Sequence, residues 1–349
     1  MKILKNKIVK TVTASILFLS LVVTGSLFFI MYYLNSEAKD CEDINLRNSL
    51  AGNLDILVVG SCQGKYAFVP SVIDDKLDAC SYNLSGIHMS HAGEYAMLEE
   101  ELCRNPVELV VIDIDYDVLS YTTKGVKALG EITLIPRLAG GRKKIEYFFR
   151  NVHIEDYKVL YSSYMSYGLT AFIGNLVGTY ESAVDSEAKG YYSRECNDQT
   201  IPDDKCSQFK NSNQLCTEIL ENNNEKVAAL IELCRSYGTD VVMCMTPASD
   251  SFVWEYNGLD EIYANVSAIA DEYDVDYFDF NLLKNKSEIL NDAESYEGKA
   301  HLSDTGSKIF TEEFCEILKK RENGENIKDL FYGSYEEAKE NSPYAKVAE

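Results

Sequence analysis

The stretch Asp55-Ile-Leu-Val-Val-Gly60-Ser61-Cys62 decides the fold that this sequence predicts. Four consecutive apolar residues, rich in β-branched side chains, follow the aspartate without polar alternation, which is typical of a strand buried on both faces of a parallel sheet. Glycine ends the run. Ser61 and Cys62 then stand at the carboxyl end of the strand, where open α/β sheets bind their ligands. We therefore expect a first strand at residues 55–60 that carries two small nucleophilic side chains at its end.

Similar apolar runs recur along the chain, with helical patterns between them. The further predicted strands are residues 107–113, 240–246 and 275–280, and the predicted helices are residues 93–104, 213–237, 259–273 and 304–320. Strands that alternate with helices in this way form α/β folds, in which the connections cross over between parallel strands. The sequence therefore predicts a doubly wound, mostly parallel sheet of the flavodoxin-like kind.

Residues from about 122 to 212 interrupt this alternation with amphipathic, tyrosine-rich stretches, including residues 145–150 and 157–176. Aromatic residues at helical spacing belong to the core more often than to a glycan or acyl groove. We interpret this segment as a helical insertion within a domain of residues 35–320. Residues 321–349 are charged and contain turn dipeptides, so we expect a C-terminal tail with a short helix near 329–340.

Residues 11–34 contain no charged side chain. A helix of that length rises about 36 Å, which exceeds the roughly 30 Å of a bilayer's hydrocarbon core. Four lysines precede the segment and four acidic residues follow it closely, so the positive-inside rule places residues 1–10 in the cytoplasm as a short stub. We expect a single-pass protein of the cell membrane with an extracytoplasmic C-terminal domain.

The alternative is a cleavable signal peptide, whose apolar region is usually about 7–15 residues long. The apolar run here is longer, and Ser36-Glu-Ala38 is a poor cleavage site. We therefore expect the helix to be retained as a signal anchor.

The formal net charge of −23 limits the classes of partner that the protein can bind. Such a surface repels phosphate backbones, so nucleic-acid binding is disfavoured. The acidity itself is spread over the exported part and is explained by solubility, without implying an acidic substrate. About 310 residues follow the anchor, which is enough for a substantial hydrophobic core.

Ten cysteines in an exported chain permit disulfides, although their pairing does not follow from sequence. Cys196 and Cys206 are the best local pair, because they flank a polar stretch that contains proline. No cysteine or histidine spacing suggests zinc, and we predict neither a metal nor another cofactor.

A hydroxyl or thiol becomes nucleophilic when a base stands beside it. The exported part offers His88, His91, His153 and His301. His301 opens the segment His-Leu-Ser-Asp-Thr-Gly directly before the last predicted helix, in a loop that returns to the carboxyl edge of the sheet. His301 is therefore the favoured base for Cys62 or Ser61.

Together these pieces resemble the SGNH-like hydrolase superfamily, especially its membrane-anchored branch, which includes a protein of lipoteichoic acid D-alanylation. The resemblance runs from about residue 54 to 318. Its motifs are Asp55-Ile-Leu-Val-Val-Gly-Ser-Cys62 with Pro70 after it, Tyr82-Asn-Leu-Ser-Gly86, Val110-Val-Ile-Asp113, Thr246-Pro247, Asp279-Phe-Asn281, and His301-Leu302 with Gly306. Singly each is weak, and their order and separation give the resemblance its strength.

The resemblance implies roles for particular residues. The branch has a second serine where this chain has Cys62, so it implies Cys62 as nucleophile, with Ser61 as the substitute. The Asn83 amide, the Gly86 N–H and the backbone N–H after the nucleophile would form an oxyanion hole. The family's aspartate, three residues before the histidine, is replaced here by Gly298. Glu297 is our substitute for this acid, and Asp292 is nearby.

Two functions follow from these observations. The leading interpretation is an extracytoplasmic esterase or O-acyltransferase that acts on a cell-surface glycan or a teichoic-acid-like polymer. The resemblance also implies a multipass acyl-transfer membrane protein as partner. The rival is a catalytically inactive envelope protein that kept the fold and binds a glycan or a membrane partner. A separation of about 4 Å or less between His301 and Cys62 or Ser61 favours the enzyme. A disulfide between Cys62 and Cys80 would exclude Cys62 as nucleophile.

Overall fold

The computed structural model of the chain describes residues 2–35, 39–119, 130–131, 134–151, 188–194, 217–255, 258–290, 294–298 and 300–341, together with the single residues 162, 169, 170, 173 and 176. Most of the predicted insertion therefore lies outside the described residues. So do His153 and the predicted pair of Cys196 and Cys206.

Five parallel strands form the central sheet. They are β1 (Ile56–Val59), β2 (Ser81–Asn83), β3 (Leu109–Asp113), β4 (Asp240–Met245) and β5 (Asp276–Asp279), in the spatial order β2-β1-β3-β4-β5. The predicted doubly wound α/β fold is confirmed, and the order is the flavodoxin-like one, with its switch point between β1 and β3. Strand β2 was not among the predicted strands, because three residues give no recognisable apolar run.

Alternate residues of the central strands belong to two separate hydrophobic cores. Leu57 and Val59 of β1 pack into one core, whereas Ile56 and Val58 pack into the other. Successive side chains of a strand point to opposite faces of a sheet. Both faces of this sheet are covered, so every position of β1 must be apolar. The absence of alternation in the sequence is explained by this burial.

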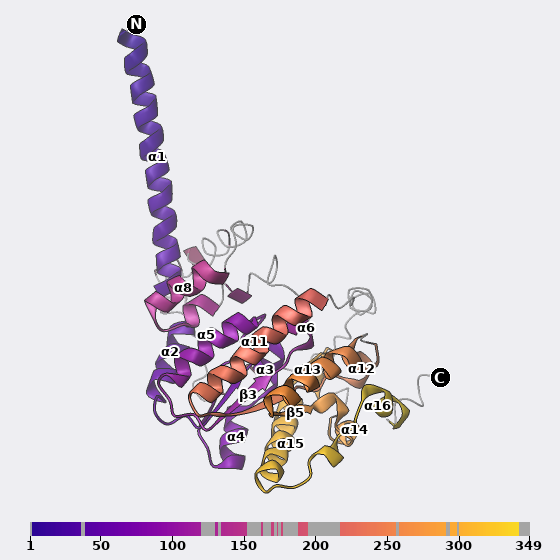
Figure 1. The fold of residues 1–349 in the computed structure, drawn as a ribbon. Coiled ribbons are helices and arrows are strands. Elements are labelled where there is room, and N and C mark those ends of the chain that lie inside the picture. Colours follow the sequence, from indigo (N-terminus) through magenta and orange to yellow (C-terminus); the bar gives the residue numbers. More distant parts are fainter. Residues whose placement is uncertain are drawn as a thin grey trace.

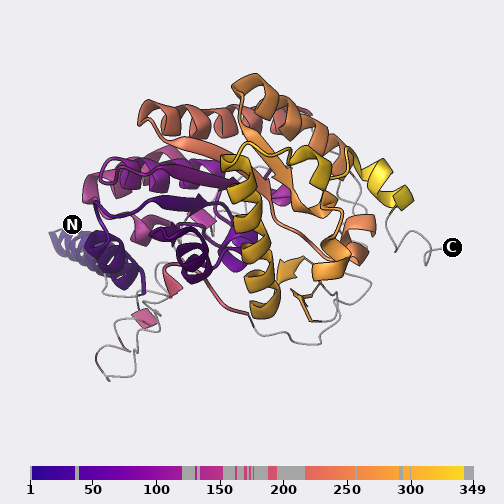
Figure 2. The same ribbon diagram turned by 90° about the horizontal axis from the view of Figure 1, so that it is seen from below.

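Helices cover both faces of the sheet (Figures 1 and 2). On one face lie α5 (His91–Leu102), α11 (Thr217–Ser236) and α13 (Leu259–Tyr273), and on the other lie α3 (Cys62–Ala67), α4 (Pro70–Leu77) and α15 (Asp304–Glu322). The four predicted helices are confirmed to within a few residues at their described ends. The shorter elements are α6 (Tyr116–Leu119), α12 (Asp250–Glu255), η5 (Phe280–Leu282), α14 (Lys286–Ile289), β6 (Tyr296–Glu297) and β7 (His301–Leu302).

The start of α15 is fixed by a side-chain cap. The Ser303 hydroxyl accepts a hydrogen bond from the Gly306 N–H at 3.1 Å, which satisfies one of the free donors of the first turn. The last turn carries Lys319, Lys320 and Arg321, which favour the negative end of the helix dipole. The cap matters for the site, because it fixes the start of α15 and with it the path of the chain directly after His301.

The segment expected as a tail packs on the domain as far as Asn341. It contains η6 (Lys328–Leu330) and α16 (Tyr335–Asn341). Tyr335 is 1% exposed, and its hydroxyl donates to Asp279 Oδ2 at 2.8 Å. The short helix expected near residues 329–340 is present as α16. A buried tyrosine also fixes this segment to the end of β5, a contact that the charged composition conceals.

The N-terminal helix α1 (Lys2–Asn35) projects from the domain (Figure 1). Within it, Lys7–Ser26 has a mean hydropathy of 1.9 and none of its surface is buried. Among the described helices, α1 alone is long and apolar enough to cross a membrane, a criterion that a signal sequence also meets. The apolar helix predicted from the sequence is present.

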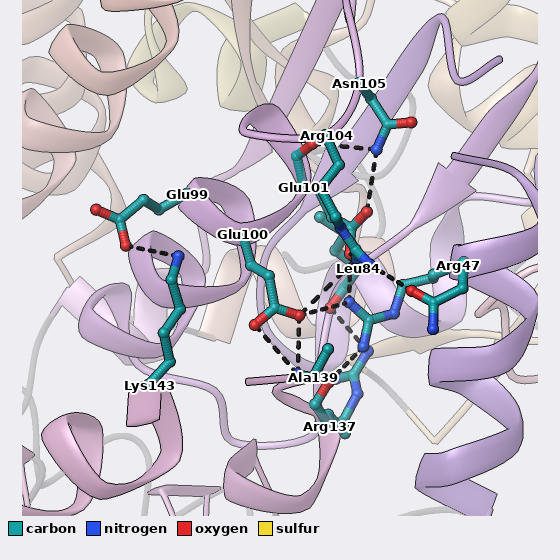
Figure 3. A network of polar contacts seen from close by, with 11 residues as sticks. Arg47, Leu84, Glu99, Glu100, Glu101, Arg104, Asn105, Arg137, Ala139 and Lys143 are labelled. Atoms are coloured by element: carbon teal, nitrogen blue, oxygen red, sulfur yellow. Dashed lines mark hydrogen bonds and ion pairs between the residues drawn. The ribbon is translucent and has the colours of Figure 1, made fainter. Parts of the chain in front are cut away.

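A buried arginine joins the next helix, α2 (Lys39–Ser49), to the domain (Figure 3). Arg47 is wholly buried, and its guanidinium pairs with Glu101 on α5 and donates to the Arg137 carbonyl in η2 (Ile135–Arg137). Removing one partner of a buried ion pair leaves an uncompensated charge. This network therefore holds α2, the segment that follows α1, firmly on the domain.

Candidate active site at the carboxyl edge of the sheet

The turn after β1 packs directly on the end of β3. A Cβ at Gly60 would lie 2.7 Å from the Asp113 Cβ, and one at Gly64 would lie 2.8 Å from the Ser85 Oγ. Real Cβ atoms do not approach other atoms so closely, so both positions require glycine. This close packing directs the chain sharply from strand into helix α3. Cys62, the first residue of α3, is placed at the carboxyl edge of the sheet, at the switch point between β1 and β3.

His301 comes to the same edge from the far end of the sequence. It lies in β7, which pairs with β6 as a short antiparallel hairpin. Its Nε2 is 3.4 Å from the Cys62 Sγ. The ring of Tyr66 packs edge-on against the imidazole, with centroids 5.1 Å apart. The two residues therefore meet within the 4 Å that separates the two functional interpretations.

The imidazole of His301 is neutral at pH 7. Burial lowers the pKa of His301 to about 4, and the positive charge of Arg194 acts in the same direction. A neutral imidazole keeps a lone pair on one ring nitrogen, which can accept a proton from the nearby thiol. The structure thus places a neutral imidazole beside the Cys62 sulfur as its potential base.

Ser61 faces a different partner. Its hydroxyl is wholly buried and donates a hydrogen bond to the Asp115 carboxylate. Asp115 Oδ2 is also 3.9 Å from the Cys62 sulfur. Among the described residues, the structure gives no contact between Ser61 and His301. Of the two predicted nucleophiles, Cys62 is therefore the one brought to the base, and it is partly exposed whereas Ser61 is not.

Glu297 is close to His301 in the hairpin but is engaged elsewhere. The two are directly opposite each other in the β6–β7 pair, yet the Glu297 carboxylate pairs with Arg194. Arg194 also donates to the Tyr66 hydroxyl at 3.0 Å and lies over that ring, 4.0 Å from its centroid. No carboxylate among the described residues bonds to His301. The structure thus brings Glu297 to the site through Arg194 rather than through the imidazole.

Gly298, the residue at which the sequence resemblance expected an acid, has a backbone conformation that suits glycine. Its φ is +65°, in the left-handed region that glycine adopts without cost, and it turns the chain between β6 and β7. An aspartate there would carry the strain of a side chain in that region. Asp292, the other acid considered, lies outside the described residues.

Asn83 and Gly86 lie beside the nucleophile turn, but their donors are already used. The Asn83 amide donates to the Gly64 and Phe68 carbonyls at 2.9 and 3.0 Å, and the Gly86 N–H donates to the Gly60 carbonyl at 3.1 Å. An amide nitrogen has two protons, so none is left for an oxyanion. This geometry corrects the expected role: both residues brace the turn. The third predicted donor, the backbone N–H after Cys62, lies in the first turn of α3, where N–H groups have no partner within the helix.

Six cysteines in the described part of the chain are reduced thiols, Cys62 and Cys80 among them. The disulfide that would exclude Cys62 as nucleophile is not formed. Among those same residues, no group of three or more histidine, cysteine, aspartate or glutamate side chains is arranged to hold a metal ion.

Two residues of the site escaped the sequence analysis. Asp115 follows β3 at the neighbouring strand end, and that position was its only sequence signal. Arg194 lies in a short described segment, residues 188–194, which runs past the site. The Tyr192 N–H donates to the Lys65 carbonyl at 3.2 Å, and the Asp304 N–H donates to the Arg194 carbonyl at 2.8 Å. This segment therefore links α3 to the start of α15.

Comparison with known proteins found solved structures similar to this chain, among them the following two. A candidate acylhydrolase from Bacteroides fragilis covers 83% of this chain and 97% of its own, with 9% sequence identity and a TM-score of 0.37. A GDSL-like lipase from Bacteroides thetaiotaomicron covers 83% of this chain and 99% of its own, with 9% identity and a TM-score of 0.39. No protein-family model and no curated protein matches the chain.

Proposed function

We propose that the protein is a membrane-anchored, extracytoplasmic esterase or O-acyltransferase that acts on a cell-envelope polymer, with Cys62 as nucleophile and His301 as base. The observation that carries this proposal is the 3.4 Å separation between the Cys62 Sγ and the His301 Nε2. A nucleophile needs a base within hydrogen-bonding reach, and apo sites are often somewhat looser than the reacting complex.

The proposed reaction has two steps. In the first, His301 takes the thiol proton while the sulfur of Cys62 attacks an acyl carbonyl. Collapse of the tetrahedral intermediate breaks the ester bond, and the leaving alcohol takes the proton back from His301. In the second step, His301 takes a proton from water or from a hydroxyl of the polymer, whose oxygen attacks the thioester. The carbon–sulfur bond breaks, and the Cys62 sulfur takes the proton back from His301 to leave as the thiol. Water makes the protein an esterase, and a polymer hydroxyl makes it a transferase.

The environment of His301 predicts slow turnover. In serine hydrolases a carboxylate stabilises the imidazolium, and its loss reduces turnover by about 10⁴. Here the described neighbours of His301 include the cation Arg194, which disfavours the imidazolium. An anionic substrate group that pairs with Arg194 would weaken the repulsion between Arg194 and the imidazolium, and would raise the pKa of His301.

Helix α1 determines where the proposed reaction would take place. Helix α1 contains an apolar stretch long enough to span a bilayer, and the four lysines before it favour a cytoplasmic N-terminus. A retained helix would keep the domain beside a cell-surface glycan or teichoic-acid-like polymer. It would also place the domain near a multipass acyl-transfer membrane protein, the donor that the family resemblance implies.

A second function has its own supporting observation. Gly298 stands where the family has its acid, and Glu297 is bound by Arg194. These features favour an inactive protein that kept the fold and binds a glycan or a membrane partner. In that case the contact between Cys62 and His301 has no catalytic consequence.

Site-resolved labelling tests the proposal. The detergent-solubilised full chain is treated with an iodoacetamide probe and with a fluorophosphonate, and peptides are quantified by mass spectrometry. We expect thiol labelling of Cys62 to fall about tenfold in His301→Ala. Exposed Cys103 serves as an internal control with unchanged labelling. We also expect Cys62→Ala, but not Ser61→Ala, to abolish hydrolysis of an activated acyl ester. Equal labelling of Cys62 in both chains, without hydrolysis, would favour the binding protein.

A further inference from the structure

Helix α8 (Gly141–Asn151) is positively charged within an acidic protein. It contains four basic residues and one acidic residue, Arg142, Lys143, Lys144, Arg150 and Glu146. The whole chain carries a net charge of −23. Charge of one sign concentrated on one element determines which surface approaches an oppositely charged partner. The partner of α8 is therefore anionic.

The same helix exposes large apolar side chains. Ile145 is 59% exposed and Phe149 is 74% exposed. Residues four apart lie on the same helix face, and Arg142, three residues before Ile145, extends that face. Tyr147 and Lys144, on the opposite side, are buried against the domain. Helix α8 is thus fixed by one side and presents apolar and cationic groups together on the other.

The position of α8 selects a membrane as the partner. Both α8 and α1 contact η2, and α8 lies beside the domain end of α1 (Figure 1). The uncharged stretch of the chain continues to Asn35, the last residue of α1. The surface of a bilayer that α1 crosses therefore runs close to α8.

We infer that α8 lies in the headgroup region of an anionic bilayer, with Ile145 and Phe149 in the acyl boundary and the arginines at lipid phosphates. Helices with basic and apolar groups on one face insert about 5–10 Å into this region. Helix α8 takes part in two ion pairs, Arg142 with Glu146 and Lys143 with Glu99. They do not prevent this, because both are exposed pairs of little strength. A groove of about 240 Å³ behind α8 is lined by Lys143, Arg150 and Lys226, and also by Glu99 and Glu146.

This inference rests on the anchoring part of the proposed function and deepens it. The rest of the surface is acidic and is repelled by anionic lipids, whereas α8 is attracted. A single helix alone would leave the domain free to tilt and rotate. Helix α8 supplies a second attachment, which gives the domain one orientation and holds the Cys62–His301 site at a constant height above the bilayer.

Depth-dependent fluorescence quenching tests the inference. The chain has one tryptophan, Trp254, so a Trp254→Phe background allows single reporters. Phe149→Trp is introduced into the full chain in vesicles of phosphatidylglycerol and phosphatidylcholine, with and without brominated acyl chains. Ile145→Trp provides a second reporter on the same face. Phe18→Trp, within the apolar stretch of α1, reports spanning, and Tyr237→Trp, exposed at the end of α11, is the negative control.

We expect brominated lipid to quench Phe149→Trp by about half or more, and Tyr237→Trp hardly at all. Arg142→Gln with Arg150→Gln should reduce the quenching at Phe149→Trp in anionic vesicles and leave it unchanged in zwitterionic ones. Quenching at Phe18→Trp without quenching at either α8 reporter would overturn the inference and leave the anchor standing. That result would assign the α8 face to a protein partner. Loss of quenching at Phe18→Trp as well would reject the anchor itself.

Discussion

At the scale of single residues, the protonation of His301 decides how the site can act. Burial and the positive charge of Arg194 lower its pKa to about 4. We expect Arg194→Gln to raise this pKa toward 6.5, because removing a nearby cation favours the imidazolium. Histidine NMR titration measures the change directly, and with four histidines in the chain the signals can be assigned by a His301→Gln variant.

The control for this titration is Arg142→Gln, an exposed cation on α8, which should leave the His301 midpoint where it was.

The sign of the shift also has a consequence for stability. Between pH 6.5 and 4 the unfolded chain binds a proton that the folded chain does not. The free energy of unfolding therefore decreases by about 3 kcal/mol as the pH is lowered through this range. His301→Gln should remove that part of the loss. A midpoint near 6.5 in the parent protein would contradict the structure.

The residues of the site differ in how far the sequence could predict them. Cys62 and His301 each stand next to a recognisable element boundary, so sequence order led to both. Asp115 and Arg194 do not. Asp115 reaches the site because two strand ends are neighbours in space, and Arg194 because residues 188–194 run past α3. Such contacts depend on tertiary packing, which leaves no local pattern.

At the scale of elements, the nucleophile turn depends on its glycines. We expect Gly64→Ala to destabilise the fold by about 1–3 kcal/mol, because its Cβ would lie 2.8 Å from the Ser85 Oγ and 2.9 Å from the Asp113 Oδ2. Urea unfolding measures the loss. Gly140→Ala is the matched control, since its nearest contact would be an ordinary 3.7 Å and its cost should be within about 0.5 kcal/mol. Equal costs for the two variants would refute the packing argument.

Buried strands and long helices were the predictable elements. Strands β1, β3 and β4 are apolar at successive positions because two cores cover them, and that pattern is visible in the sequence. The hairpin of β6 and β7 was not predicted, although it carries His301. Each of its strands has two residues, and its turn depends on one glycine with a positive φ. Short elements of this kind are specified by their surroundings.

At the scale of the whole molecule, Arg47 couples α2, the helix after α1, to the domain of the central sheet. We expect Arg47→Met to cost about 3 kcal/mol of unfolding free energy, since Glu101 would lose a buried partner. Arg104 also pairs with Glu101 and softens the loss. Lys308→Met, which removes an exposed pair on α15, should cost less than about 0.5 kcal/mol. Denaturant unfolding of the full chain in detergent compares them, and equal costs would show that the network in Figure 3 carries little stability.

The charge asymmetry around α1 predicts the membrane topology of the chain. Cytoplasmic lysines set the orientation of a membrane helix, and retention of the helix leaves the chain at its full 39.3 kDa. We expect this intact mass for protein extracted from membranes of a bacterial host, and digestion of the domain by protease added to spheroplasts.

Replacing the four lysines before residue 11 with glutamine should leave a fraction of chains protected from that protease, because the orientation signal is weakened. Replacing four lysines of the domain, at positions 308, 319, 320 and 328, is the matched control and should protect none. A mass corresponding to cleavage after Ala38 would mean that the helix is a signal peptide. The domain would then leave the membrane, and the orientation that α8 provides would have no anchor to act with.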